Sequence, residues 1–142
     1  MIVVDVNLLL YAVISGFPQH ERARAWWEEV LNGPREVGLA SPALFGFLRI
    51  ATNPRVLTAP MPVTVAIGHI TSWLEQPNVR FLVAGGRHLD LAFELLADVG
   101  TAGNLTTDVQ LAALALELDA ELHSNDSVFG RFKALHWVNP LD

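Results

Sequence analysis

The sequence predicts a single α/β domain in which helices cover the faces of a mainly parallel sheet. Three observations support this fold class. The length of 142 residues suits one domain, short apolar runs alternate with longer stretches of helical periodicity, and no repeat or linker divides the chain. Strands that alternate with helices pair in parallel, because each helical crossover returns the chain to the same end of the sheet. We therefore expect one domain over residues 1–142.

The N-terminal quarter predicts one strand and two helices. Residues 1–4 form a continuous apolar, β-branched run, typical of a strand covered on both faces, and residues 8–14 indicate a buried helix. Residues 19–31 repeat apolar side chains at helical spacing, with charged side chains between them. The Asn32-Gly33-Pro34 sequence should end that helix.

A second strand is expected at residues 37–40, followed by a helix that reaches Asn53. Ser41 is expected to cap this helix, and Pro42 to occupy its first helical position. A proline-bearing link over residues 58–62 then leads to the next helix.

The middle of the chain predicts a helix over residues 63–74, a strand over 79–83 and an amphipathic helix over 89–99. Gly85 and Gly86 should turn the chain, and Gly100 should close the second helix.

The C-terminal part begins with a helix that is apolar on nearly all sides. Residues 107–110 have the spacing of a capping box and precede this core helix over 111–118. Residues 122–124 and 135–138 are short apolar runs that predict the last two strands.

The composition excludes several classes of function. The chain has no cysteine, which rules out disulfides, thiolate catalysis and cysteine-ligated zinc. Its net charge of −6 argues against a general electrostatic grip on nucleic acid, although a metal-dependent nuclease stays compatible with it. A hydrophobic content of 51% leaves apolar surface for a partner, so we expect a homodimer or a bound peptide.

The sequence lacks the signatures of secretion, of membrane insertion and of several common active sites. Asp5 and Asn7 interrupt the apolar N-terminus, no basic residues precede it, and no apolar run is long enough to span a bilayer. Zinc-protease, serine-hydrolase and nucleotide-binding motifs are also missing. We expect a cytoplasmic protein that makes no membrane contact.

Three aspartates form the candidate site. Asp5 directly follows the first strand, Asp108 lies near the start of a helix, and Asp126 lies in the loop after a strand. In parallel sheets ligands bind beyond the carboxyl ends of the strands, where these residues can meet. Carboxylates gathered there repel one another by about 4 kcal/mol per pair at about 4 Å, unless a cation lies between them. The pattern therefore indicates a divalent-metal site.

Each aspartate also has an ordinary structural explanation. Asp5 suits a helix cap, Asp108 a favourable charge at a helix N-terminus, and Asp126 an Asx turn. For Asp108 and Asp126 taken singly, the structural explanation is the simpler one. Asp5 needs a cation or several hydrogen-bond donors, because a half-buried charge without partners is costly.

Four further residues are candidates for supporting roles. Asn7 either orients Asp5 or caps the first helix, and Asn104 either forms a turn or positions the helix of Asp108. Arg49 either pairs with an aspartate or contacts a substrate phosphate. Ser124 precedes Asp126 by two residues and belongs to the same motif.

In the order and spacing of the motifs that contain these residues, the chain resembles a PIN-domain protein, and more closely a VapC toxin of the VapBC toxin–antitoxin systems. The resemblance runs the length of the chain and rests on residues 2–9, 46–54, 103–105, 108–115, 124–132 and 137–141. It implies a three-layer α/β/α sandwich with Mg²⁺- or Mn²⁺-dependent endoribonuclease activity on RNA, with tRNA or rRNA as the expected target. It also implies a VapB-type antitoxin whose tail covers the groove and whose basic side chain reaches the carboxylates.

Asp5, Asp108 and Asp126 match three of the family's four acidic positions. Gly46 stands where the family usually has glutamate, and Val128 where it often has a further aspartate. We expect Asp5 and Asp108 to hold the metal, with Asp126 completing the cluster directly or through water. The alternative is a catalytically weak PIN-like module that binds RNA or a partner protein, with Gly46 as the mark of decay. A receiver domain fits less well, because position 6 is valine and the only lysine, Lys133, precedes the last strand.

Overall fold

The computed structural model describes residues 1–142 and contains one sheet of five strands. The strands are β1 (Ile2–Val4), β2 (Val37–Ala40), β3 (Val79–Leu82), β4 (Glu121–His123) and β5 (Trp137–Val138). They lie in the order β3-β2-β1-β4-β5, and all four neighbouring pairs are parallel. The predicted parallel sheet is confirmed.

Six α-helices and two short 3₁₀ helices connect the strands. They are α1 (Val6–Val13), α2 (His20–Leu31), α3 (Ser41–Ala51), α4 (Val63–Leu74), α5 (His88–Val99), α6 (Thr106–Glu117), η1 (Gly103–Leu105) and η2 (Ser127–Arg131). Residues 63–74 and 37–40 match the expected bounds, and the other elements differ by a few residues at their ends.

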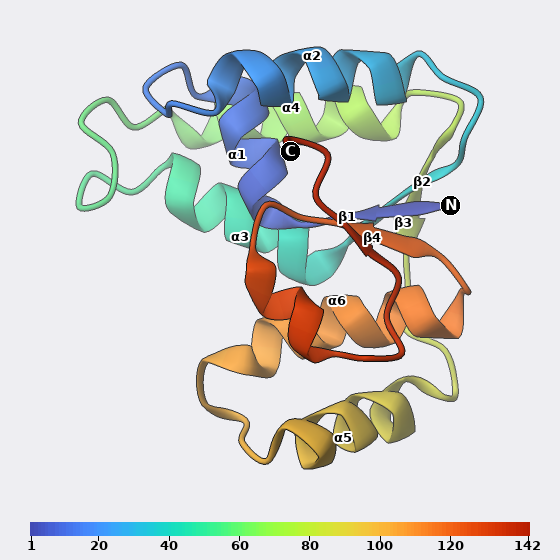
Figure 1. The fold of residues 1–142 in the computed structure, drawn as a ribbon. Coiled ribbons are helices and arrows are strands. Elements are labelled where there is room, and N and C mark those ends of the chain that lie inside the picture. Colours follow the sequence, from blue (N-terminus) through green and yellow to red (C-terminus); the bar gives the residue numbers. More distant parts are fainter.

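Helices cover both faces of the sheet (Figure 1). In that view α1, α2 and α4 lie above the sheet and α6 lies below it, while α5 packs on the outer side of α6. Helix α3 packs against α1 and α4 and also reaches α6. The three-layer α/β/α arrangement is thus confirmed, with α5 as an additional outer helix. None of the helices is both long and apolar enough to cross a bilayer.

The strand order places a topological switch at β1. From β1 the chain moves through β2 to β3 on one side, and it then crosses to β4 on the other side. In such sheets the crevice beyond the carboxyl ends of the strands at the switch is the usual ligand site. The carboxyl ends of β1 and β4 carry Asp5 and Ser124 respectively.

The core explains why the apolar runs form these elements. All residues of β1 and β2 are buried, because helices cover both faces of these two strands. Helix α6 buries six of its residues between the sheet and α5, which confirms the expected core helix. Trp27 and Trp73 belong to the same core on the opposite face, where their rings meet edge to face at 5.7 Å.

Two predicted helix caps are wrong. Strand β2 runs directly into α3, so Ala40 with its extended backbone occupies the cap position and Ser41 is already helical. The expected capping box at residues 107–110 does not form, because η1 leads without a break into α6 and Leu105 precedes the helix. The Gln110 amide instead donates to the Thr106 carbonyl at 3.0 Å. Pro42 lies in the first turn of α3, one position later than predicted, because Ser41 takes the first helical position.

Candidate functional site

Asp5 lies at the junction between β1 and α1. Its backbone N–H donates to the His123 carbonyl at 3.0 Å, which extends the ladder between β1 and β4 by one residue. Its side chain caps α1, with Oδ1 accepting from the Val6 N–H at 2.7 Å. Only 4% of the residue is exposed. The helix cap was one of the alternatives for Asp5, and a buried carboxylate was expected to need a cation or several donors.

Ser124, the first residue after β4, connects the two strand ends. Its hydroxyl is fully buried and donates to Oδ2 of Asp5 at 2.7 Å. The same oxygen accepts from Asn7 Nδ2 at 3.2 Å and from the Asp126 N–H at 3.0 Å. One donor and two acceptor positions are the whole capacity of a serine hydroxyl, so Ser124 is completely satisfied. Its geometry is therefore fixed by three neighbours.

Asn7 joins α1 to the loop after β4. Besides its bond to Ser124, its Oδ1 accepts from the Asn125 N–H at 3.3 Å. Asn7 thus bonds neither Asp5 nor the first turn of α1 and acts on Asp5 only through Ser124. A further bond, from Trp137 Nε1 to the Ser124 carbonyl at 3.0 Å, ties β5 to the same point.

Asp126 and Asp108 approach Asp5 from two other elements. Asp126 is exposed and precedes η2, where its Oδ1 accepts from the Val128 N–H at 2.9 Å in the expected Asx turn. Asp108 is half-buried in the first turn of α6. The loop after β4 reaches the carboxyl end of β1 through the bond from the Asp126 N–H to the Ser124 hydroxyl, and α6 packs against β1.

The pKa values show that the three carboxyl groups interact. Burial, together with the negative charges of Asp5 and Asp126, raises the pKa of Asp108 to about 6. Burial also raises the pKa of Asp5, and the charge of Asp126 adds to this, while the hydrogen bonds from Ser124 and Val6 oppose it. Burial and the neighbouring negative charges favour a proton on these carboxyl groups, whereas a bound cation would favour their charged forms.

The three carboxyl groups fit a hydrated divalent ion better than a dehydrated cage. In this side-chain arrangement no three acidic or histidine groups stand close enough to share one ion directly. Mg²⁺ keeps several of its waters and is commonly held by one or two carboxylates, so a looser set of oxygen donors suits it. The absence of cysteine and of a nearby histidine cluster also disfavours softer metals.

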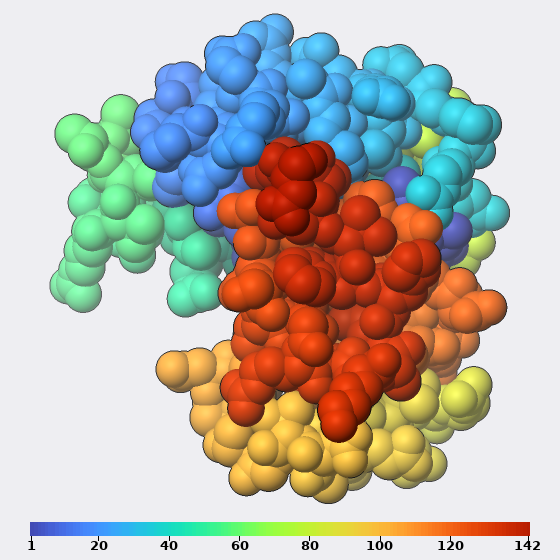
Figure 2. Space-filling view, viewed as in Figure 1, coloured from blue at the N-terminus to red at the C-terminus, as the bar shows by residue number.

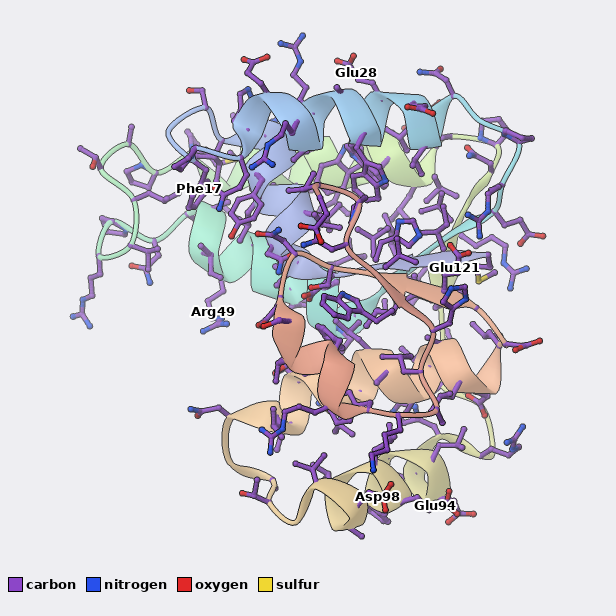
Figure 3. The ribbon with its side chains drawn as sticks, in the orientation of Figure 1. Phe17, Glu28, Arg49, Glu94, Asp98 and Glu121 are labelled. Atoms are coloured by element: carbon purple, nitrogen blue, oxygen red, sulfur yellow. The ribbon has the colours of Figure 1, made fainter.

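Arg49 and Asn104 lie outside this hydrogen-bonded cluster. Arg49 is exposed and has no acidic partner within 4.0 Å, so the first of its two alternatives, pairing with an aspartate, does not occur. It extends from α3 on the left of the view (Figure 3), where the surface is hollowed between the green and orange segments (Figure 2). Asn104 is exposed in η1 and its side chain makes no hydrogen bond, which leaves it the turn role.

Gly46 faces the residue that follows Asp5. A Cβ atom built on Gly46 would lie 3.1 Å from Cγ2 of Val6, a side chain that can move. The position at which this chain lacks an acidic residue therefore adjoins the carboxyl end of β1.

Tyr11 is a neighbour of the acids that sequence analysis missed. Burial and the charges of Asp126 and Asp5 raise its pKa, so its hydroxyl lies within electrostatic reach of both carboxylates. Tyr11 follows Asp5 by six residues in the apolar α1 segment. The apolar pattern alone gave no sign that its hydroxyl would lie within electrostatic reach of the aspartates.

The strand behind Ser124 is fixed by an ionic cluster. His123, expected as a strand residue, ends β4, and its Nε2 lies 2.8 Å from Oε2 of Glu121, which Arg35 contacts at 3.0 Å. The hydrogen bond from His123 is the main cause that lowers the pKa of Glu121 to about 2. The Trp26 ring stacks on the His123 ring at 5.8 Å. These contacts fix the position of β4, whose His123 carbonyl accepts the hydrogen bond from the Asp5 N–H.

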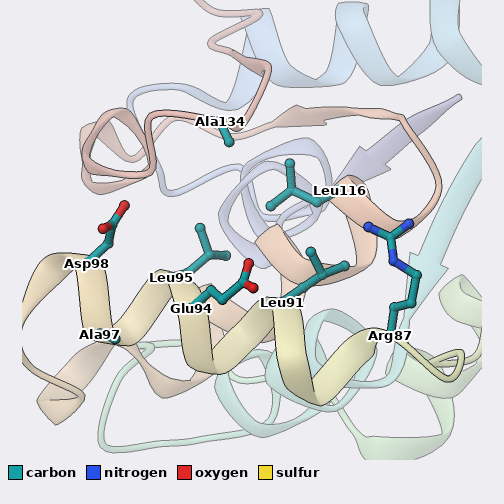
Figure 4. A pocket seen from close by; sticks show the side chains of 8 residues that line it. All are labelled: Arg87, Leu91, Glu94, Leu95, Ala97, Asp98, Leu116 and Ala134. Carbon is teal, nitrogen blue, oxygen red and sulfur yellow. The ribbon is translucent and has the colours of Figure 1, made fainter.

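One cavity lies away from the aspartates. It is an open groove of about 530 Å³ along α5, facing α6 and the loop that contains Ala134 (Figure 4). Glu94, Asp98 and Arg87 line it, but none of the candidate site residues does. We therefore place the candidate site at the carboxyl ends of β1 and β4.

Comparison with known proteins agrees with this arrangement. Residues 2–135 match the family model of the PIN domain. The chain is 61% identical to ribonuclease VapC33 of Mycobacterium tuberculosis over 99% of each chain, and 39% identical to ribonuclease VapC37 of that organism over 99% of this chain and 97% of the relative. The structure of VapBC-1 from nontypeable Haemophilus influenzae has the same fold, with a TM-score of 0.70 at 20% identity and complete coverage of both chains. The chain therefore belongs to the PIN-domain family and, within it, to the VapC ribonucleases.

Proposed function

We propose that this chain is a metal-dependent endoribonuclease that cleaves RNA phosphodiester bonds and serves as the toxin of a toxin–antitoxin pair. The observation that carries the proposal is the buried carboxylate of Asp5, which accepts hydrogen bonds from Ser124 and Val6. The charge of Asp126 raises the pKa of Asp5, and the charge of Asp5 raises the pKa of Asp108. Membership of the VapC ribonucleases supports the same activity.

Asp5 and Asp108 are assigned to hold Mg²⁺, or Mn²⁺ in its place, and Asp126 to complete the cluster directly or through water. A divalent ion bound there supplies a water of lowered pKa and neutralises charge on the phosphate. Ser124 keeps Oδ2 of Asp5 in one orientation, and Asn7 keeps Ser124 in place. Arg49, which has no acidic partner, is assigned to a phosphate of the RNA.

The family and the net charge support structured RNA as the proposed substrate class. With a net charge of −6, this chain cannot hold RNA by general attraction, so a metal and a few local arginines must do so. Structured RNAs with exposed single-stranded loops, such as tRNA or rRNA, fit a site that needs an unstacked strand.

The test is cleavage of total cellular RNA by partner-free protein in Mg²⁺, in Mn²⁺ and in EDTA. We expect discrete fragments in either metal, none in EDTA and none with Asp5→Asn. Asp98→Asn is the matched control, because it removes one exposed carboxylate from α5 and changes the net charge equally. The thermal melting curve of Asp5→Asn must match that of the wild type, so that loss of fragments reflects lost activity and not lost folding.

The rival is the catalytically weak PIN-like module, which the lack of an acid at Gly46 favours. Calorimetric titration with Mg²⁺ or Mn²⁺ separates the two functions. Absence of metal binding at millimolar concentration, in protein that is folded and cleaves nothing, would establish the rival.

The proposed protein partners are an antitoxin of the VapB type and a second copy of the chain. The acidic net charge suits a basic partner, and ten large hydrophobic side chains are exposed. Co-expression with the small open reading frame adjacent to the gene should suppress toxicity, and persistent toxicity despite good expression of that partner would contradict the pairing. Light scattering of the purified chain tests the homodimer.

A further inference from the structure

An apolar groove lies between the loop that follows α1 and the loop that follows α3. It has a volume of about 520 Å³ and is lined by residues 13–17 on one side and by residues 56–59 and Met61 on the other. Seven of its ten lining residues are hydrophobic and none carries a charge. Both loops lie at the left end of the molecule in Figure 1, the end to which the carboxyl terminus of β1 points.

The aromatic rings of Tyr11 and Phe17 connect the region of the aspartates with this groove. Phe17 lines the groove, and its ring meets that of Tyr11 edge to face with centroids 5.0 Å apart. The Tyr11 hydroxyl lies within electrostatic reach of Asp5 and Asp126. Helix α1 has eight residues, so its two ends are about 12 Å apart, a distance that a few nucleotides of a single strand can span.

The charges around the groove suit a polyanion. Arg55 directly precedes Val56 in the groove wall, and Arg49 extends from the end of α3 on the same side of the molecule as Phe17 (Figure 3). Both arginines are exposed, and neither has an acidic side chain within 4.0 Å. An uncharged apolar wall beside unpaired guanidinium groups is the arrangement by which single-stranded nucleic acid is held, with bases on the wall and phosphates on the cations.

We propose that this groove binds an unpaired nucleobase of the RNA strand whose backbone passes the three aspartates. The inference rests on the proposed ribonuclease function and adds the place where a base beyond the scissile phosphate is held. The lining offers few hydrogen-bonding side chains, so the groove selects an unstacked base over a paired one and distinguishes weakly between bases. Arg49 and Arg55 contact the phosphates on either side of this base.

The test compares two fluorescein-labelled probes by anisotropy, with Ca²⁺ in place of Mg²⁺ to prevent cleavage. One probe is a twelve-nucleotide oligouridylate, and the other is the same backbone without bases. The variant is Val56→Glu, which places a carboxylate in the groove at a side chain that is 56% exposed and whose replacement leaves the core intact. The control is Val83→Glu, which makes the same exchange at a 76% exposed valine that follows β3 and does not line the groove.

We expect the wild-type protein to bind the oligouridylate roughly fivefold to a hundredfold more tightly than the base-free backbone, the range that stacking of a single base gives. Val56→Glu should reduce this preference to nearly one, and Val83→Glu should retain it. Equal binding of both probes by the wild-type protein, or absence of binding to either, would overturn the inference.

If Val56→Glu and Val83→Glu weakened binding of the oligouridylate equally, the inference would also be overturned, because the loss would then reflect net charge alone. Occupation of the groove by a protein partner predicts a different result. In that case Val56→Glu would abolish neutralisation by the co-expressed partner and leave the preference between the probes unchanged. Metal-dependent cleavage of total RNA is measured separately, so failure of the base site and failure of the ribonuclease function are distinguishable.

Discussion

The hydroxyl of Ser124 donates a hydrogen bond of 2.7 Å to Oδ2 of Asp5, across 119 positions of sequence. The bond joins the ends of the neighbouring parallel strands β1 and β4, at the topological switch of the sheet. Because Asp5 is almost fully buried, its two carboxylate oxygens depend on Ser124 and on the Val6 N–H for partners. The bond therefore affects the stability of the protein and the charge of Asp5 together.

Ser124→Ala should lower the stability of the protein and disfavour the charged form of Asp5. A buried carboxylate that loses a donor costs roughly 1 to 3 kcal/mol of unfolding free energy, measured by urea denaturation. The pKa of Asp5 should rise further, because one of the two bonds that lower it is gone. Metal binding in the variant should then need a higher pH.

Ser72→Ala serves as the control for this variant. Its hydroxyl donates to the His69 carbonyl on the exposed side of α4, so its removal should change stability by no more than about 0.5 kcal/mol. Equal effects of the two substitutions would contradict the role assigned to Ser124.

Asp108→Asn should stabilise the metal-free protein at neutral pH. The pKa of Asp108 is about 6 in the folded state and 3.8 ordinarily, so the folded state holds this proton more tightly. Stability from this group is therefore fully present below about pH 4, and it is lost as the pH rises through about 6. In EDTA the variant should have the higher urea midpoint at pH 7.5. The advantage should shrink at pH 4.5, and an advantage that did not change with pH would refute the linkage.

Gly46→Glu should increase affinity for Mg²⁺ or Mn²⁺. It restores the acidic residue that the family usually has beside the carboxyl end of β1, and its Cβ atom requires only a small movement of Val6. Removing a glycine from the interior of α3 also favours the helix by up to about 1 kcal/mol. Calorimetric titration should show tighter metal binding. Gly68→Glu in α4, where a Cβ atom meets open space, should leave the metal affinity unchanged.

Glu117→Ala should loosen the turn between β3 and α5. The Glu117 carboxylate accepts from the Gly85 N–H at 2.8 Å and from the Arg87 N–H at 3.0 Å, and these bonds lower its pKa. Hydrogen exchange over residues 83–90 should accelerate in the variant, while cleavage of RNA stays close to that of the wild type. Glu28→Ala, which removes an exposed ion pair with Arg24 in α2, should leave exchange in that segment unaltered.

Much of the fold was predictable because it depends on local patterns. The apolar runs of β1 and β2 and the helical periodicity of α2, α4 and α5 specify those elements from neighbouring residues alone. Asp5 was predictable for the same reason, since a charge at the end of a buried strand needs partners whatever surrounds it. The errors at Ser41 and at residues 107–110 arose where a strand or a 3₁₀ helix runs directly into a helix and leaves no free cap residue.

The sequence by itself determined the parallel α/β architecture, the buried carboxylate at the end of the first strand and the acidic residues available to accompany it. Only the tertiary structure decided that Ser124, and not Asn7, bonds Asp5, that Arg49 stays unpaired and that Tyr11 lies within electrostatic reach of the carboxylates. Hydrophobic periodicity specifies which face of an element is buried, whereas contacts between distant residues depend on the order and register of the strands. In this protein that order places β4 beside β1, and the site forms at the junction of these two strands.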